Sequence, residues 1–177
     1  VLVNEYEEMV NSVKKYSGFY IGRYELSNEG VQKEKATLTN KNWYELYKKC
    51  TTLNASDKVE SKMIWGIQWD LACDFISKKG EQKSITNSNT WGNYADSTGK
   101  AAVMNGTTKM YGNKQVTGFS EYWKANNIYD LAGNCYEWTQ DANNTNNRAS
   151  RGVDCYTNAS NNRVSRRDYS DAYSSNS

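Results

Sequence analysis

The sequence predicts a single domain of the α+β class in which irregular loops form a large part of the chain. Three segments have the apolar spacing of helices, and short β-favouring segments are separated from them by long stretches of Asn, Ser, Thr and Gly. The 177 residues suffice for one core, and six Trp and fourteen Tyr supply apolar area to fill it. We find no internal repeat and no domain boundary.

The three predicted helices cover residues 4–15, residues 40–50 and the second half of residues 61–80. Their inward faces are predicted from apolar residues spaced three and four apart, which are Tyr6, Met9, Val10 and Val13; Trp43, Leu46, Tyr47 and Cys50; and Trp69, Ala72, Cys73 and Ile76. Their ends are predicted from capping residues, which are Asn4, either Asn40 or Asn42, and Gly80.

Strands are predicted where successive side chains of a β-favouring segment alternate between two faces. Residues 19–26 (FYIGRYEL) and 148–152 (RASRG) have this pattern. Residues 84–118 have no clear periodicity, so we predict a loop-dominated stretch there. Its order is expected to depend on three aromatic residues, Trp91, Tyr94 and Tyr111.

The composition excludes several classes of function. Net charge is only +2, from 22 basic and 20 acidic residues, so neither nucleic acid nor an anionic membrane surface is an expected partner. No apolar run approaches the roughly 18 residues of a membrane span, which predicts no membrane insertion. The chain contains no His, which excludes Ser/His and Cys/His nucleophile pairs and His-ligated metals.

The cysteines are widely spaced and form no C-x-x-C pair, which argues against a zinc or redox motif. They are Cys50, Cys73, Cys135 and Cys155. The first two lie among apolar residues of predicted helices, where a buried free thiol is a commoner role than a disulfide. We therefore expect reduced thiols and synthesis in a cytoplasm.

Three blocks of the chain form a recognisable series: GFYIGRYE (18–25), NIYDLAGNCYEWTQD (127–141) and RASRG (148–152), with IWGIQWD (64–70) between the first two. In this order they resemble the formylglycine-generating-enzyme, or sulfatase-modifying-factor, branch of the C-type lectin fold. The resemblance extends over nearly all of residues 1–177. It implies one C-type-lectin-like domain with short twisted strands, two or three helices and long irregular loops.

The oxygen-dependent enzymes of this family use two cysteines just beyond the last of these segments. The corresponding region here, GVDCYTNASNNRVSRR, has Cys155 as its only thiol, at the place of a family Trp. The resemblance therefore implies a non-catalytic relative. An oxidase of the formylglycine-generating type is the disfavoured alternative, because the catalytic Cys pair is missing.

Residues 152–177 resemble the variable region of proteins diversified by retroelements, which are often phage tail-tip or cell-surface receptors. The segment is rich in Tyr, Ser, Asn and Asp, the composition of an antibody paratope. Ser and Asn richness is also typical of a disordered tail, but the three Tyr favour ordered display. The expected ligand-binding residues are Asp154, Tyr156, Asn158, Ser160, Asn161, Asn162, Asp168, Tyr169, Ser170, Asp171, Tyr173, Ser174 and Asn176.

The resemblance also implies a fixed framework around this segment. Ser165 would be invariant, and the loop would be held by Arg148, Arg151, Gly152 and Arg167, with the Arg side chains bonding main-chain carbonyls. Related sequences continue into a last strand that pairs beside the strand equivalent to residues 18–25. We expect this strand to be lacking, which would leave that sheet edge open and residues 152–177 looser than in relatives.

The block YDLAGNCYEW matches the calcium-site pattern of the family. The implied ligands are the side chains of Asp130 and Glu137 and the carbonyls of Gly133 and Cys135. Calcium is an expected option and not a requirement. In the alternative, the two carboxylates cap turns and pair with Arg148 or Arg151.

A sugar-stacking platform is a further hypothesis, built from Trp123, Tyr129, Tyr136 and Trp138. Core packing is favoured for these rings, because the Trp residues of the family lie in the hydrophobic centre of this block. A chain without Pro also cannot carry an E-P-N or Q-P-D carbohydrate motif.

The expected function is non-catalytic binding of an unknown protein or cell-surface ligand through a hypervariable surface. The resemblance implies a place on a phage virion, at the tail tip, or on a bacterial cell surface. A structural phage tail module without a variable role is the second alternative.

Overall fold

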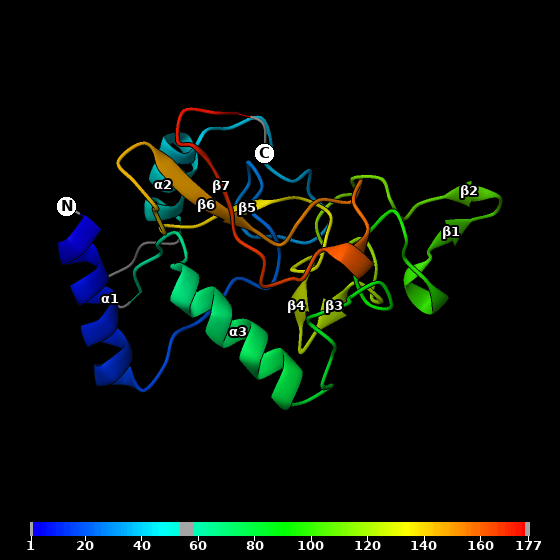
Figure 1. Cartoon of the computed structure of the whole chain (residues 1–177), viewed down its shortest axis with the longest axis horizontal. Helices are drawn as coiled ribbons and strands as arrows, with labels where there is room; N and C mark the ends of the chain where they lie inside the picture. The colour runs from blue at the N-terminus through cyan, green and yellow to red at the C-terminus, as the bar shows by residue number, and fades with distance from the viewer. Residues whose placement is uncertain (1, 54–58, 176–177) are drawn as a thin grey trace.

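The computed structural model describes residues 2–53 and 59–175, and it confirms the α+β class (Figure 1). Three helices are present in these residues: α1 (Leu2–Tyr16), α2 (Trp43–Thr51) and α3 (Gly66–Lys78). The strands are β1 (Met104–Asn105), β2 (Thr108–Lys109), β3 (Lys124–Ala125), β4 (Ile128–Tyr129), β5 (Glu137–Trp138), β6 (Asn147–Arg151) and β7 (Asp168–Asp171). Two single 3₁₀ turns are η1 (Gly99–Ala101) and η2 (Ala159–Asn161). None of the described helices is both long and apolar enough to cross a membrane.

The strands form three small antiparallel sheets. Two are the hairpins β1–β2 and β3–β4, and the third has the order β5-β6-β7. In the third sheet, Glu137 lies opposite Arg151 and Ser150 lies opposite Asp168. The predicted strand at 148–152 is therefore confirmed as β6, the central strand of the largest sheet.

Helix α1 packs at the periphery, and none of its described residues is buried. It contacts the rest of the domain through an edge-to-face pair between Tyr6 and Trp65, with 5.1 Å between ring centroids, and through Glu5, which accepts a hydrogen bond of 2.6 Å from the Tyr47 hydroxyl. The prediction of Asn4 as N-cap is wrong. Asn4 lies inside the helix, which is described from Leu2 onward, and Leu2 packs against the apolar cluster that surrounds α2.

Helices α2 and α3 form where predicted. Asn42 caps α2 through a capping box in which Glu45 N–H donates to the Asn42 side chain and the Glu45 carboxylate accepts from Asn42 N–H, each at 3.0 Å. In α3 the four predicted inward residues are all buried. Its first amide, Gly66 N–H, donates to the Asp141 carboxylate at 3.0 Å.

Residues 19–26 do not form the predicted strand. Their carbonyl groups bond singly to different parts of the chain: Arg23 accepts from Tyr129 N–H at 2.9 Å, and Leu26 accepts from Leu38 N–H at 2.8 Å. A β-favouring sequence becomes a strand only where a neighbour continues the ladder, and no strand of the described residues does so here. The expected open sheet edge at this segment is consequently not formed.

The stretch 84–118 is mostly irregular, as predicted, and Trp91 and Tyr94 are buried in the core. The prediction missed the β1–β2 hairpin inside it. The two turn residues are Gly106 and Thr107, and Gly106, the first of them, adopts a φ of 59°. The β3–β4 turn uses Asn126 and Asn127 at positive φ, a conformation that Asn tolerates better than most residues.

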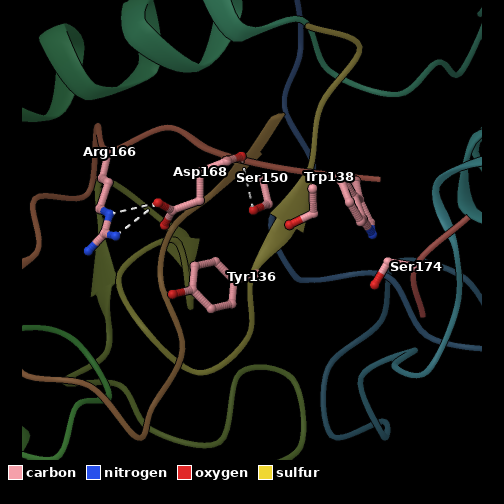
Figure 2. Close-up of a pocket in the computed structure, with 7 residues that line it drawn as sticks. Tyr136, Trp138, Ser150, Arg166, Asp168 and Ser174 are labelled. Atoms are coloured by element: carbon pink, nitrogen blue, oxygen red, sulfur yellow. Dashed lines mark hydrogen bonds and ion pairs between the residues drawn. The ribbon is translucent and has the colours of Figure 1, made fainter. Parts of the chain in front are cut away.

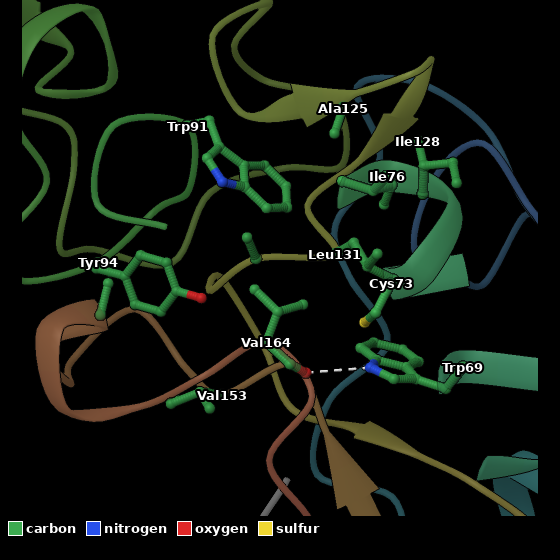
Figure 3. Close-up of a cluster of buried hydrophobic side chains, with 12 residues drawn as sticks. Trp69, Cys73, Ile76, Trp91, Tyr94, Ala125, Ile128, Leu131, Val153 and Val164 are labelled. Carbon is green, nitrogen blue, oxygen red and sulfur yellow. Dashed lines mark hydrogen bonds between the residues drawn. The ribbon is translucent and has the colours of Figure 1, made fainter. Parts of the chain in front are cut away.

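The main hydrophobic cluster joins α3 to the loops around the β5-β6-β7 sheet (Figure 3). Trp69, Cys73 and Ile76 of α3 belong to this cluster, and the Trp69 indole donates a hydrogen bond of 3.0 Å to the Val164 carbonyl. A second cluster connects α2 with β5 and the end of the chain; it consists of Trp43, Met63, Trp138 and Ala172. Both clusters therefore contain residues from the last quarter of the sequence.

Candidate functional site

Residues 152–175 alternate between buried anchors and exposed side chains. The anchors are small apolar residues of at most 1% exposure, which are Val153, Cys155, Ala159, Val164 and Ala172. Backbone hydrogen bonds fix the same residues: Cys155 N–H donates to the Asn134 carbonyl at 3.2 Å, and Ala172 N–H donates to Asn146 at 2.8 Å. The segment is thus folded into the domain, and it is not the disordered tail of the alternative interpretation.

The predicted ligand-binding residues fall into three groups. Eight are exposed: Tyr156, Asn158, Ser160, Asn161, Tyr169, Ser170, Asp171 and Tyr173. Asp154, Asp168 and Ser174 are partly buried, and Asn176 lies outside the described residues. Asn162 is only 9% exposed, and its side chain donates to the Asn158 carbonyl at 2.9 Å and accepts from Arg166. We therefore correct its role from ligand contact to support of the loop.

Strand β7 divides the predicted residues between two faces of the sheet. Asp168 and Ser170 share one face with Ser150, whereas Tyr169 and Asp171 alternate to the other face. The expected ligand-binding residues of this strand therefore do not share one face of the sheet. Successive side chains of a strand point to opposite faces, and amino-acid composition alone carries no information about this alternation.

The face that carries Asp168 and Ser170 contains a depression of about 230 Å³ (Figure 2). It is lined by Tyr136, Trp138, Ser150, Arg166, Asp168, Ser170 and Ser174. Arg166 is held in place by Asp168, whose Oδ1 lies 2.9 Å from both Nε and Nη2. Burial first, and then the charges of Asp154 and Asp168, raise the pKa of Tyr136, so its hydroxyl stays protonated at neutral pH.

A second depression, of about 430 Å³, is lined by Asn161, Arg163, Ser165 and Arg166. Because Arg166 lines both, the two depressions are neighbours. The sequence-based expectation did not include Ser150, Arg163 or Arg166 in the site, and it considered Tyr136 only as part of the sugar platform. The sequence did contain a signal for a cationic site here, because the segment NNRVSRR has three arginines in seven residues.

The framework arginines hold the segment differently from expectation. Arg148 does bond main-chain carbonyls, those of Thr145 at 3.3 Å and Asn147 at 3.0 Å. Arg151 and Arg167 instead both pair with the carboxylate of Asp70 on α3. The expectation of carbonyl partners is therefore corrected, because a carboxylate with two oxygens can serve two guanidinium groups.

Gly152 fits its predicted framework role for a steric reason. It adopts a φ of 85°, and a Cβ at this position would lie 2.1 Å from Glu137 Oε2. A side chain would therefore clash with the carboxylate of β5.

Three carboxylates, of Glu25, Asp130 and Glu137, are buried within electrostatic reach of one another. Glu25 accepts from Asn134 Nδ2 at 2.6 Å, and Asp130 accepts from Gly118 N–H at 2.6 Å. One oxygen of each carboxylate has no hydrogen-bond partner in the described part of the chain: Glu25 Oε1, Asp130 Oδ1 and Glu137 Oε2. Burial raises the pKa of all three groups, that of Asp130 to about 7.

The donor chemistry of this cluster fits a hard cation such as Ca²⁺, because its unpaired atoms are carboxylate oxygens. Asp130 and Glu137 are the two expected side-chain ligands. Within residues 2–53 and 59–175, no three acidic, Cys or His side chains converge on a point that could hold a metal. An ion here would therefore also need the expected carbonyls of Gly133 and Cys135.

We predict that the domain is more stable near pH 5 than near pH 8 in the presence of a chelator. Folding raises the pKa of Asp130 from 3.8 to about 7, so in this interval the folded state binds a proton that the unfolded state does not. The free energy of unfolding therefore falls as pH rises through the interval. Asp130→Asn mimics the protonated form and should reduce the loss. Thermal unfolding of both proteins at the two pH values is the measurement, and a wild-type curve independent of pH contradicts the prediction.

The proposed sugar platform is mostly core. Trp123, Tyr129 and Trp138 are buried, as core packing requires, and the Trp123 indole donates to the Ala101 carbonyl at 2.9 Å. Tyr136 is partly buried and lines the first depression. The four rings therefore do not form one exposed stacking surface.

The four cysteines are unpaired thiols. Burial raises the pKa of Cys155 to about 11. Burial is also the main cause of the raised pKa of Cys135, to which Cys155 adds a lesser contribution. These two thiols thus lie within electrostatic reach, which sequence separation did not indicate. Both remain protonated at neutral pH, and a protonated thiol is a poor nucleophile.

The three blocks that carry the family resemblance meet in space. Asn134 of the second block bonds Glu25 of the first, and Glu137 of the second pairs in register with Arg151 of the third. Comparison of the chain with protein-family models, with curated proteins and with solved structures found no match.

Proposed function

We propose that this protein is a non-catalytic ligand-binding protein that presents residues 154–174 on a C-type-lectin-like scaffold. The observation that carries the proposal is the alternation of buried anchors and exposed polar or aromatic side chains. The buried anchors fix the backbone of the segment and leave the Tyr156 and Tyr173 side chains 68% and 74% exposed, where the rings contribute little to the core. Fixing the backbone beforehand lowers the entropy cost of binding.

The chemistry of the exposed side chains also supports binding. Tyr156 and Tyr173 offer rigid amphipathic rings, while Asn158, Ser160 and Asn161 offer adaptable hydrogen bonds. The Tyr173 ring lies 4.8 Å from that of Tyr44 on α2 and so extends the surface beyond the C-terminal segment.

The proposal includes diversification of this segment by a retroelement and a place on a phage tail tip or a bacterial surface. Exposed positions between fixed anchors tolerate many side chains, because substitutions there change stability little. The test is the genomic locus. A near copy of the codons for residues 152–177 beside a reverse transcriptase gene is expected, and its absence contradicts the retroelement.

An oxidase of the formylglycine-generating type is not the proposed function, because residues 152–177 contain one thiol, Cys155, where those enzymes use two. A purely structural tail module differs from the proposal in one respect: its exposed residues would have no ligand.

Amide hydrogen exchange tests the anchored display directly. We expect slow exchange at Cys155, Val164 and Ala172, whose amides are hydrogen-bonded and buried. Fast exchange is expected at Tyr156, whose amide donates only to the nearby Asp154 side chain, at 3.1 Å in an exposed position. Uniformly fast exchange from Gly152 onward would contradict the proposal.

The exposed tyrosines should matter for binding and not for folding. Tyr156→Ala and Tyr173→Ala are expected to shift the melting temperature by no more than about 2 °C. The same variants should weaken binding at least tenfold on an array of bacterial surface proteins and polysaccharides. A large loss of stability would mean that the rings are part of the core.

A further inference from the structure

The second depression brings together two arginines with different surroundings. Arg166 is fixed by Asp168 and by the Asn162 side chain, so its guanidinium is oriented before any ligand arrives. Arg163 is exposed, and its guanidinium donates to no side chain or carbonyl among the described residues. One oriented and one available cation on the same 430 Å³ depression are suited to an anionic group.

The charge balance of the two depressions is positive. Their lining residues include Arg163 and Arg166 but only one carboxylate, Asp168, which is already paired with Arg166. The remaining polar lining consists of hydroxyl and amide groups. The unmatched charge therefore lies at Arg163.

The first depression has the lining of a site for a polyhydroxylated ring. It combines the Tyr136 ring with the hydroxyls of Ser150, Ser170 and Ser174, and it contains no aliphatic side chain (Figure 2). An acidic peptide side chain offers the Tyr136 ring only its one or two methylene groups, whereas a pyranose offers both a C–H face and hydroxyl groups. The lining therefore favours a saccharide over a peptide.

We propose that the two depressions together bind an acidic saccharide. The sugar ring lies against Tyr136, and its carboxylate, sulfate or phosphate group is bound by Arg163 and Arg166. This inference rests on the proposed function and specifies the chemical class of its ligand. Arg166 connects the two halves of the site because it lines both depressions.

The test compares two probes with the same sugar backbone, the charged tetragalacturonate and its uncharged methyl ester. We expect the full chain to bind tetragalacturonate at least tenfold more tightly, with the affinity falling as salt rises. Tetraglutamate, which carries a similar charge on a peptide, and inorganic sulfate should each bind at least tenfold more weakly than tetragalacturonate.

Arg163→Gln should lower the affinity for tetragalacturonate about tenfold, as expected for loss of a charge-assisted hydrogen bond. Arg23→Gln is the matched control, since Arg23 is also exposed but lies on the segment bonded to Tyr129. Equal binding of the ester, equal binding of tetraglutamate or sulfate, or an unchanged Arg163→Gln variant would each overturn the proposal. Such a result leaves the amide-exchange pattern unaffected, so it is distinguishable from failure of the proposed function.

Discussion

Asp70→Ala is expected to destabilise the domain by about 3–5 kcal/mol. Asp70 on α3 is the carboxylate partner of Arg151, whose side chain is completely buried. Two further nitrogens of this guanidinium, Nε and Nη1, already lack hydrogen-bond partners among the described residues. Removal of Asp70 leaves a buried cation without its counter-charge, and it also releases Arg167 from the same carboxylate.

Chemical denaturation of the two proteins measures this effect, and Asp74→Ala is the control. Asp74 lies one turn further along the same helix and pairs with Lys78 at 2.5 Å on the surface, so its loss should cost no more than about 0.5 kcal/mol. Similar losses for the two variants would show that the buried pair has no special importance. Amide exchange should additionally accelerate around Arg167 in Asp70→Ala only.

Gly133→Ala is expected to cost at least about 3 kcal/mol, because two effects add. Gly133 adopts a φ of 82°, and a Cβ there would lie 2.0 Å from the Asn93 carbonyl oxygen. That oxygen cannot withdraw easily, since it accepts from Asn134 N–H at 3.1 Å. The Asn93 side chain is also bonded, to the Asn113 carbonyl at 2.8 Å and to Gly112 N–H at 2.9 Å.

Gly106→Ala separates the two effects. Gly106 has a φ of 59°, but no atom lies within 4 Å of a Cβ built there. Its substitution should therefore cost only the backbone term, about 1–2 kcal/mol. Equal unfolding free energies for the two variants would contradict the close approach of Gly133 to Asn93.

The fold could be predicted from the sequence where local signals were sufficient. The positions of α2 and α3 were predicted from helical spacing, because their inward residues recur three and four positions apart. The residues that cap these helices can also be recognised in the local sequence. Strand β6 followed from its alternation. The signal failed at residues 19–26, where β propensity was strong but the hydrogen-bonding partner of a strand is a property of the whole fold.

From the sequence, the site could be predicted only as a segment with a characteristic amino-acid composition. The sequence alone determined that residues 152–177 are rich in Tyr, Ser, Asn and Asp, and that Val153 and Val164 are their only branched aliphatic residues. Tertiary structure decided which of these side chains are exposed, because Asn162 is buried and β7 directs Tyr169 away from Asp168.

The contacts that hold the site were likewise decided by tertiary structure. Asp70 and Arg167 are 97 positions apart in the chain, and Glu25 and Asn134 are 109 apart. Local propensity has no information about such pairs, since a partner at that distance is chosen by the packing of the core. The sequence thus determined which residue types this surface contains, and packing determined how they are arranged.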